Sequence, residues 1–369
     1  MKKIIAFFLV LSLMLAGCGS SSTPAATEAP ATEAPATEAA PEVPATTEAP
    51  VEETTVPTTE PIVYTNPLNG EILDAPYTGR VYASTISNIK SALPHVGVNQ
   101  ADILMEMYVN NSIVRCLALF SDISDVPSIG SVRSMRLMFA DLADHYDLIV
   151  SHAYGSETVM KNVEERGLED INLGNGGTNY SFRDSQRKSK LGLEHSLMGI
   201  GSGIVERAQE LGYRTEQPEG KDYGFRFTEN GIPANGEDAT EITIDLTYGN
   251  AHKETIMKYD EELSKYVFNQ YGKEMVDDAD GQKEAFTNVL VVYASIDTVK
   301  GSGALYHTAD FLAGGTGFYA CGGKIIPITW TCDDEKEPLH FFTESGEELL
   351  MGVGNTYMAI CTAESAVTY

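Results

Sequence analysis

The stretch ILMEMYVNNSIVRCLALFS, residues 103–121, decides the fold class because β-branched and apolar residues dominate both of its halves. We predict one strand at Ile103–Val109 and a second at Ile113–Ser121. Val81–Ser87 and Leu148–His152 have the same content and predict two more strands. Strand signals alternate with helix signals in this half of the chain, so we expect an α+β protein.

Three helices are expected in the same half. Ser134 has the position of an N-cap for a helix that continues to Tyr146, because apolar residues between them recur at helical spacing. Glu157–Arg166 predicts a short amphipathic helix that ends at Gly167. A later helix is predicted at Ser196–Leu211.

A glycine string, Gly199, Gly201 and Gly203, lies in this last segment. It falls inside the predicted helix and does not follow a predicted strand, so we expect no dinucleotide site there. Gly174–Gly177 predicts a loop beside a site or at an exposed tip.

Strands dominate the second half of the chain. Gly322-Gly323 between two apolar runs is a strong signal for a two-residue hairpin. We place a domain boundary near residues 235–245 and expect a mainly antiparallel β-rich second domain. Its predicted strands are Ile242–Tyr248, Thr255–Tyr259, Tyr266–Tyr271, Asn288–Ile296, Gly317–Ala320, Lys324–Thr331 and Thr356–Thr362.

The first 18 residues differ in composition from the rest of the chain. Lys2 and Lys3 precede an apolar run, Ile4–Leu15, that is shorter than the roughly 20 residues a membrane-spanning helix needs. The run predicts a secretory signal over residues 1–18. Leu15-Ala16-Gly17-Cys18 resembles the bacterial lipobox, in which the cysteine receives acyl chains such as palmitate. The resemblance implies lipid attachment at Cys18 and a place on the extracytoplasmic face of the cell membrane.

Residues 19–65 predict a disordered stalk. They repeat Ala-Thr-Glu-Ala-Pro with variations and contain eight Glu but no Lys or Arg. Such composition buries nothing and favours extended polyproline-like conformers, which at about 3.1 Å per residue would reach on the order of 140 Å. We expect the body to begin at residue 66.

The remaining charge and the cysteines exclude some functions. The whole chain has a formal net charge of −28, and most of this negative charge belongs to the body. Binding to a nucleic-acid backbone needs a basic face, so we expect no nucleic-acid partner. Cys116, Cys321, Cys332 and Cys361 have no Cys-x-x-Cys spacing, so we expect no metal site. The sequence leaves open whether Cys332 and Cys361 form a disulfide.

A series of short motifs extends over most of the body: Ile86–Asn88, Ala92, Pro94, Gly97, Gln100–Ile103, Glu106, Arg115, Ile129–Arg136, Asp141, His152–Ser156, Phe182–Asp184, Arg187, Glu194-His195, Asn288–Val291, Gly315–Gly317, Thr329-Trp330 and Gly346–Leu349. In their order and spacing these motifs resemble a known family, the YerB-like lipoproteins (DUF3048). The resemblance implies a layered α/β first domain at 66–240, a C-terminal β-rich domain at 241–369, and the cell envelope of a Gram-positive bacterium. It implies no reaction. This chain departs from the family pattern at Ser112-Ile113-Val114-Arg115, where the family pattern has Gly-Ile-Thr-Arg.

Basic residues in the first half are the main candidates for a binding site. Segments such as Ser131–Arg136, at the start of a helix, are typical of sites where N–H groups and guanidinium groups bind phosphate or carboxylate. The alternative is a structural salt-bridge network with Asp102, Glu106, Asp141 and Asp184. The candidates are Arg115, Arg133, Arg136, Arg183, Arg187, His152 and His195.

A catalytic interpretation is also open. Asp102 and Glu106 share one face of a strand, where two carboxylates could act as acid and base with His152 or His195. The simpler interpretation is that both carboxylates form ion pairs with nearby arginines. Ser156 follows a strand and precedes a helix, but an N-cap role explains it without catalysis.

Trp330 is predicted to lie in the core, with a carbohydrate-stacking platform as the alternative. We therefore expect a lipid-anchored binding protein for an anionic envelope component or a partner protein. The alternative is an envelope hydrolase directed at peptidoglycan. We assign no catalytic residue and expect no cofactor.

Overall fold

One long mixed sheet runs through both halves of the chain. The computed structural model describes residues 63–110, 112–177, 179–299 and 306–369. The predicted signal, Cys18 and nearly all of the predicted stalk lie outside these residues. Among the described helices, none combines the length and apolar character needed to cross a bilayer.

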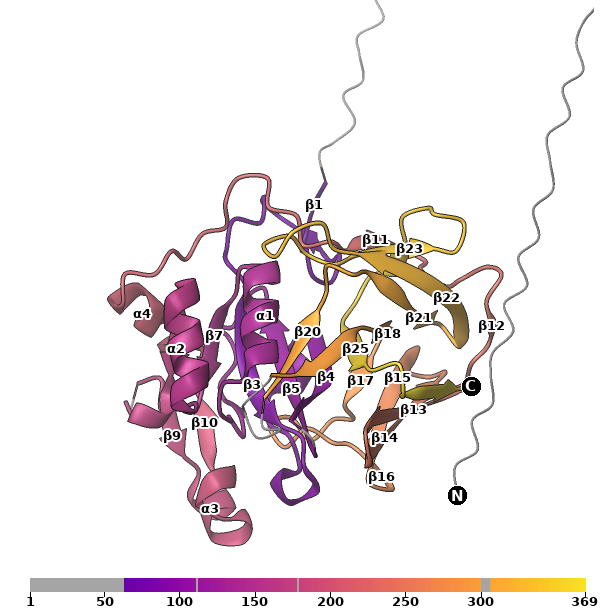
Figure 1. Cartoon of the computed structure of the whole chain (residues 1–369). Coiled ribbons are helices and arrows are strands. Elements are labelled where there is room, and N and C mark those ends of the chain that lie inside the picture. The colour runs from indigo at the N-terminus through magenta and orange to yellow at the C-terminus, as the bar shows by residue number, and fades with distance from the viewer. Residues whose placement is uncertain (1–62, 111, 178, 300–305) are drawn as a thin grey trace, which may run out of the picture. The chain divides into compact units, whose positions relative to one another are not determined.

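The sheets, shown in Figure 1, are made as follows. In the described residues the large sheet contains, in spatial order, β12 (Glu237–Asp238), β22 (Lys324–Thr331), β21 (Gly315–Cys321), β18 (Asn288–Tyr293), β25 (Thr356–Cys361), β4 (Ile103–Asn110), β5 (Ile113–Phe120), β3 (Tyr82–Ser87), β7 (Ile149–His152) and β8 (Asp170–Asn172), with β23 (His340–Thr343) beside β22. A second sheet contains β16 (Lys273–Glu274), β15 (Lys265–Gln270), β14 (Ala251–Asp260), β13 (Glu241–Tyr248) and β26 (Ala366–Thr368), with β17 (Ala285–Phe286) beside β15.

The other elements are shorter. Small sheets pair β6 (Ile129–Gly130), β10 (Leu197–Gly199) and β9 (Ser181–Arg183); β1 (Tyr64–Thr65) and β2 (Ile72–Leu73); β11 (Arg226–Thr228) and β24 (Leu350–Gly352); and β19 (Ser295–Thr298) and β20 (His307–Asp310). The helices are α1 (Leu137–Tyr146), α2 (Glu157–Arg166), α3 (Ser185–Leu191) and α4 (Gly201–Glu210), with short 3₁₀ turns η1 (Lys90–Ala92), η2 (Val98–Gln100), η3 (Leu173–Asn175) and η4 (Leu193–His195).

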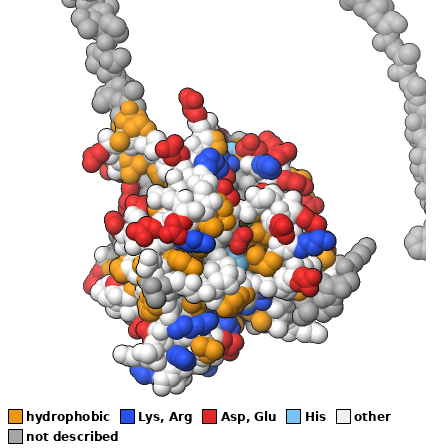
Figure 2. Space-filling model, turned by 90° about the vertical axis from the view of Figure 1, so that its left-hand side faces the viewer, with side chains coloured by type: hydrophobic (Ala, Val, Ile, Leu, Met, Phe, Trp, Pro, Cys, Tyr) orange, Lys and Arg blue, Asp and Glu red, His pale blue; other side chains and the backbone are white. Residues whose placement is uncertain are grey.

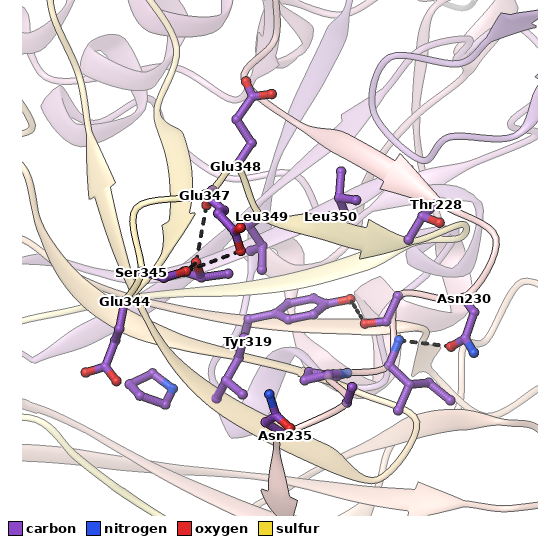
Figure 3. Close-up of a pocket in the computed structure, with 17 residues that line it drawn as sticks. Thr228, Asn230, Asn235, Tyr319, Glu344, Ser345, Glu347, Glu348, Leu349 and Leu350 are labelled. Carbon is purple, nitrogen blue, oxygen red and sulfur yellow. Dashed lines mark hydrogen bonds between the residues drawn. The ribbon is translucent and has the colours of Figure 1, made fainter. Parts of the chain in front are cut away.

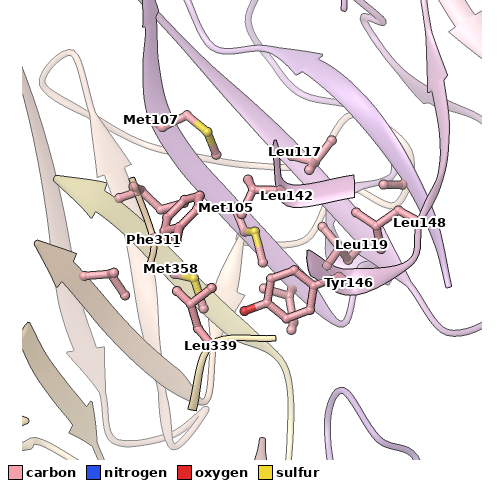
Figure 4. Close-up of a cluster of buried hydrophobic side chains, with 14 of the residues drawn as sticks. Met105, Met107, Leu117, Leu119, Leu142, Tyr146, Leu148, Phe311, Leu339 and Met358 are labelled. Atoms are coloured by element: carbon pink, nitrogen blue, oxygen red, sulfur yellow. The ribbon is translucent and has the colours of Figure 1, made fainter. Parts of the chain in front are cut away.

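Helices α1 and α2 cover one face of the large sheet. Alternate residues of β4 and β5 point to this face, because successive side chains of a strand point to opposite sides. Burying each large apolar side chain there contributes about 1.5–3 kcal/mol. Figure 4 labels the core residues Met105, Met107, Leu117, Leu119, Leu142, Tyr146, Leu148, Phe311, Leu339 and Met358.

The second sheet and α4 cover the opposite face. Ile242 and Ile244 of β13 and Phe268 of β15 pack there with Leu104 of β4. Ile204 of α4 joins the same core. The large sheet therefore lies in the middle of a layered body, as predicted for an α+β protein.

Several local predictions are confirmed. Lys324–Thr331 is a strand with the predicted bounds, and the Gly322-Gly323 hairpin joins Cys321 to Lys324 with positive φ at both glycines. Helix α2 has the predicted bounds, with Ser156 as its N-cap. Trp330 is 1% exposed and lies in the core.

Two predicted helix starts are wrong. Helix α1 begins at Leu137 because the segment before it is held extended: the N–H of Arg133 donates to Thr85 O (3.0 Å) and that of Met135 to Tyr154 O (2.9 Å). Helix α4 begins at Gly201 because Leu197–Gly199 pairs as β10 with two neighbouring strands.

The glycine string therefore does follow a short strand, but close packing explains it. A Cβ on Gly201 would lie 1.8 Å from Ile123 O, and one on Gly203 would lie 1.9 Å from Asn179 O. These glycines let α4 approach neighbouring backbone.

The predicted boundary near residue 240 divides the sequence but not the sheet. Strand β25, from the predicted second domain, pairs in parallel with β4 of the first, with Ile360 opposite Met107. The apolar cores on both faces also draw on both halves of the chain. Strands after residue 240 pair mainly antiparallel among themselves. The ordered body includes β1 at Tyr64–Thr65, two residues that were assigned to the stalk.

The cysteines in the described residues are buried and free. Cys332 and Cys361 do not form a disulfide, and they belong to the cores on opposite faces of the large sheet. Burial raises the pKa of both thiols, in Cys361 to about 12.

Candidate functional site

Three arginines gather where α1 begins, and we call Arg115, Arg133 and Arg136 the arginine cluster. Arg115 belongs to β5 and shares its sheet face with Leu117, under α1. Its Nη1 donates to Ser134 O (2.8 Å). Arg133 and Arg136 belong to the extended segment that leads into the helix.

The charges of the cluster act on one another. Arg115 is 5% exposed. Burial lowers its pKa well below the ordinary value, and the charges of Arg136 and Arg133 lower it further. Burial and the charge of Arg133 also lower the pKa of Arg136. The folded protein therefore holds like charges together in a poorly hydrated place.

Carboxylates do not balance this charge. Arg133 pairs with Glu194 at 3.2 Å, and that glutamate is 66% exposed. Arg115 and Arg136 form no ion pair with any residue that the structure describes. Arg136 donates through Nη1 to Met135 O (2.8 Å), a neutral acceptor.

Buried polar atoms without a partner surround the cluster. Within the described residues these include Ser131 Oγ, Arg133 Nε and His195 Nδ1. His195 is 2% exposed, and its Nε2 lies 3.2 Å from Glu194 Oε1. Burial and the charge of Arg133 lower the pKa of His195. Unsatisfied polar groups of this kind are uncommon in native cores and favour an interaction with a ligand.

A cavity of about 490 Å³ lies beside the cluster. Arg183 also reaches it, where its Nη1 donates to Leu193 O (2.6 Å), and Arg133 Nη1 donates to Glu194 O (2.8 Å). The cavity is lined by Val132, Arg133, Ser134, Ala153, Tyr154, Arg183, Gly192, Leu193, Glu194 and Leu197.

Basic side chains also gather on the outer surface near α3. Lys188 and Lys190 of α3 and Arg183 just before it are exposed. Figure 2 shows Lys and Arg side chains on the lower part of this face, whereas Asp and Glu predominate higher up. A local basic patch on an acidic protein favours the approach of anions.

Arg187 has a separate role. It is 6% exposed, and its guanidinium donates to Ala92 O (2.6 Å) and Pro94 O (2.9 Å). Asp278 lies 3.4 Å away. Arg187 thus ties α3 to the loop after β3 and does not line the cavity beside the arginine cluster.

Asp102 and Glu106 do not form a catalytic pair. Four residues along a strand span about 13 Å, and each carboxylate has its own partners. Asp102 accepts from Asn69 Nδ2 (2.6 Å) and from the N–H of Ser121 (2.6 Å). Burial raises the pKa of Asp102, and these hydrogen bonds oppose the rise.

Glu106 is the centre of a buried polar network between the two sheets. It is fully buried and forms an ion pair with Lys253 of β14. Thr255 Oγ1 donates to Glu106 Oε2 (2.7 Å). Asn88 and Tyr357 also donate to this carboxylate, so its oxygens have partners from four side chains.

His152 also has a full set of partners. Its Nδ1 lies 2.7 Å from Tyr154 O and its Nε2 lies 2.7 Å from Asp170 Oδ2. Ser156 Oγ accepts from the N–H of Val159 (3.4 Å) as the α2 N-cap. These contacts favour structural roles for His152 and Ser156.

Asp141 and Asp184, which were possible partners of the candidate arginines, have other contacts in the structure. Asp141 pairs with Arg166 at 2.8 Å. Asp184 caps α3 by accepting from the N–H of Arg187 (2.7 Å). Because these carboxylates have other partners, Arg115 and Arg136 are left without an ion pair among the described residues, and Glu194 pairs with Arg133. The structure also shows a role for Lys253 that the sequence did not indicate, since an inward-facing lysine on a strand has no local signal.

A larger cavity lies elsewhere in the described residues. It measures about 700 Å³ between the segments 228–235 and 343–350. Figure 3 shows Tyr319 in this cavity, where its OH donates to Gly231 O (2.9 Å), and Glu344, Glu347 and Glu348 along the side of residues 343–350. Acidic walls do not suit an anion, and none of the predicted site residues lines this cavity.

Comparisons with known proteins agree with the resemblance seen in the sequence. A protein named "Putative lipoprotein YerB" from Bacillus subtilis (strain 168) is 26% identical over 269 residues, which covers 70% of this chain and 78% of that protein. The crystal structure of the YerB protein from Bacillus subtilis matches with a TM-score of 0.68 and 21% identity, over 83% of this chain and 99% of that one. The structural likeness concerns the fold.

Two family models match the chain in sequence. Residues 68–214 match the model described as "Protein of unknown function (DUF3048) N-terminal domain". Residues 244–358 match the model described as "Protein of unknown function (DUF3048) C-terminal domain". The chain therefore belongs to the DUF3048 family and contains both of its domains.

Proposed function

We propose that the protein binds an anionic group, a phosphate or a carboxylate, at the arginine cluster. The observation that carries the proposal is Arg115, which is 5% exposed, lies within the influence of two further guanidinium charges, and pairs with no carboxylate in the described part of the chain. An uncompensated buried charge is unfavourable. A bound anion would offset this cost by charge-assisted hydrogen bonds.

The start of α1 supports the same proposal. Its N-cap residue, Arg136, makes no side-chain capping bond. The first N–H groups of a helix have no partner within the helix, and the helix dipole favours negative charge near them. Helix N–H groups and guanidinium groups therefore point to the same kind of ligand.

A place on the outer face of the cell membrane is part of this proposal. The relative from Bacillus subtilis is named a lipoprotein, and this chain has a lipobox-like Leu15–Cys18 after a short apolar run. The signal peptide would be removed, acylated Cys18 would anchor the chain, and residues from 19 up to β1, which begins at Tyr64, would act as the stalk. The ligand would then be an anionic envelope component or an acidic group on a partner protein.

Thermal unfolding of the full-length chain with added inorganic phosphate tests the anion site. We expect the melting temperature to rise with phosphate concentration, because a ligand that binds only the folded state stabilises it. The rise should be absent in Arg115→Met. Arg207→Met, which removes an arginine on the exposed side of α4, is the matched control and should keep it.

A second variant protects the test against a folding defect. If Arg115→Met does not fold, Arg136→Met removes the partly buried charge at the helix start instead. The same measurement is made with acetate. If neither phosphate nor acetate raises the melting temperature of the unmodified chain, the arginine cluster is not an anion site.

A further inference from the structure

Tyr154 lies in the cavity wall in an unusual conformation. Its φ is +60°, a region that residues other than glycine seldom adopt. Its side chain is 48% exposed although it is large and aromatic. Strained backbone and exposed aromatic surface are both uncommon and both cluster at binding sites.

Hydrogen bonds hold the carbonyl, the N–H and the phenol OH of Tyr154. Its carbonyl accepts from the N–H of Met135 (2.9 Å) and lies 2.7 Å from His152 Nδ1. Its own N–H donates to Asn172 Oδ1 (3.0 Å). Its phenol OH donates to Gly174 O. The strained conformation is therefore maintained by the surrounding strands and by η3.

The ring itself lies flat on Gly174. A Cβ at Gly174 would meet three atoms of the Tyr154 ring at 2.5–2.8 Å, so one ring face rests on that glycine. Tyr154 lines the cavity together with Arg133 and Arg183. The half-exposed Tyr154 ring is thus held rigidly, in a residue that lines the same cavity as two arginines.

We propose that the cavity binds a saccharide that carries a phosphate or a carboxylate. This inference rests on the proposed function and names its ligand class. The anion binds at Arg133, the member of the arginine cluster that lines the cavity, with Arg183 beside it, and the C–H face of the sugar ring packs on Tyr154. The exposed carboxylate of Glu194 and the carbonyl groups around it are acceptors for sugar hydroxyls.

The dimensions and composition of the site suit this ligand. A cavity of about 490 Å³ lies within the usual range for small-molecule sites. Its walls combine apolar residues such as Val132 and Leu197 with the charged residues Arg133, Arg183 and Glu194. A bare inorganic anion would leave the apolar wall and the tyrosine ring uncovered.

Isothermal titration of the full-length chain with inorganic phosphate, glucose and glucose 6-phosphate tests the inference. We expect glucose 6-phosphate to bind about tenfold more tightly than phosphate, because aromatic stacking adds to the contribution of the anion. Glucose alone should not bind measurably. Glucuronate in a parallel titration distinguishes a carboxylate from a phosphate as the preferred anion.

Variants separate the platform from the anion site. Tyr154→Asn removes the aromatic ring, and asparagine tolerates positive φ. We expect this variant to bind inorganic phosphate and glucose 6-phosphate with equal affinity. Tyr180→Asn is the matched control, because Tyr180 also packs on a glycine, Gly177, and its OH donates to Gly176 O (2.8 Å), but it does not line the cavity. This control should keep the tenfold preference.

Each outcome has a distinct meaning. The saccharide inference is wrong if the unmodified chain binds inorganic phosphate and glucose 6-phosphate with equal affinity. It is also wrong if Tyr154→Asn still prefers glucose 6-phosphate. Either result would leave the anion site intact. If adenosine monophosphate binds more tightly than glucose 6-phosphate, Tyr154 stacks on a flat base, and the saccharide inference is wrong. If no anion binds at all, the proposed function itself is wrong, and the inference fails with it.

Discussion

Glu106 and Arg115 project from neighbouring strands onto opposite faces of the same sheet. In the β4–β5 pair, Glu106 lies opposite Cys116 and Arg115 lies opposite Met107, so the two charged residues are one position out of step. Because side chains alternate along a strand, this offset puts the sheet between them. The Glu106 carboxylate therefore pairs with Lys253, and the Arg115 guanidinium has no carboxylate partner in the part of the chain that the structure describes.

Loss of Lys253 should be strongly destabilising. Lys253→Met leaves the fully buried Glu106 carboxylate without its cation, and we expect a loss of about 3–5 kcal/mol in the free energy of unfolding. Urea denaturation measures it. Adding Glu106→Gln to the same chain should recover part of the loss.

The matched control is Lys258→Met, which removes a lysine from the same strand. Lys258 pairs with Glu241 on the surface, where both side chains are about half exposed. We expect a change of about 0–1 kcal/mol there. Equal effects at both lysines would contradict a special role for the buried pair.

Arg115 should behave in the opposite way when no anion is present. Arg115→Met replaces an unpaired buried charge with an apolar side chain of similar length. We expect the free energy of unfolding in anion-poor buffer to be unchanged or higher, by up to about 2 kcal/mol. A loss above about 3 kcal/mol in urea denaturation would mean that the guanidinium has a structural role through Ser134 O.

Gly201→Ala should prevent α4 from docking. The added Cβ would lie 1.8 Å from Ile123 O, and backbone atoms cannot move away as a side chain can. We expect a loss of more than about 3 kcal/mol or failure to fold. Gly212→Ala is the control: its Cβ meets nothing within 4 Å, so only its φ of +73° is unfavourable, at about 1 kcal/mol. Circular dichroism during thermal unfolding compares the two variants.

One surface pair should make stability depend on pH. Hydrogen bonding to Arg226 lowers the pKa of Asp222 from 3.8 to about 2. Since the folded pKa is lower than the unfolded one, the stabilisation is present above pH 4 and is lost as the pH falls toward 2. Both side chains are more than a third exposed, so we expect less than about 1 kcal/mol.

Urea denaturation between pH 2 and pH 5 checks this prediction. Asp222→Asn should be less stable than the unmodified chain at pH 5 and equally stable near pH 2. A difference that stays constant across the range would show that the aspartate stabilises through something other than its charge.

The sequence by itself determined the local structure wherever neighbouring residues decide it. The Gly322-Gly323 hairpin, the strand Lys324–Thr331 and the helix that Ser156 caps are all correctly predicted. Turn glycines, capping side chains and β-branched runs act within a few residues, so their effect can be read from the sequence. The family also followed from motifs in the sequence.

Only the tertiary structure decided which charges meet. Helix α1 starts later than the sequence predicts because the N–H groups of Arg133 and Met135 donate to the carbonyls of Thr85 and Tyr154, which lie on other segments, and keep residues 133–135 extended. The pairing of Glu106 with Lys253 joins residues 147 positions apart across two sheets. The position of the Tyr154 ring depends on Gly174 of η3, and only the fold brings Tyr154 into the same cavity wall as Arg133 and Arg183. Such contacts arise from sheet order and packing between layers, which periodicity and spacing along the chain do not specify.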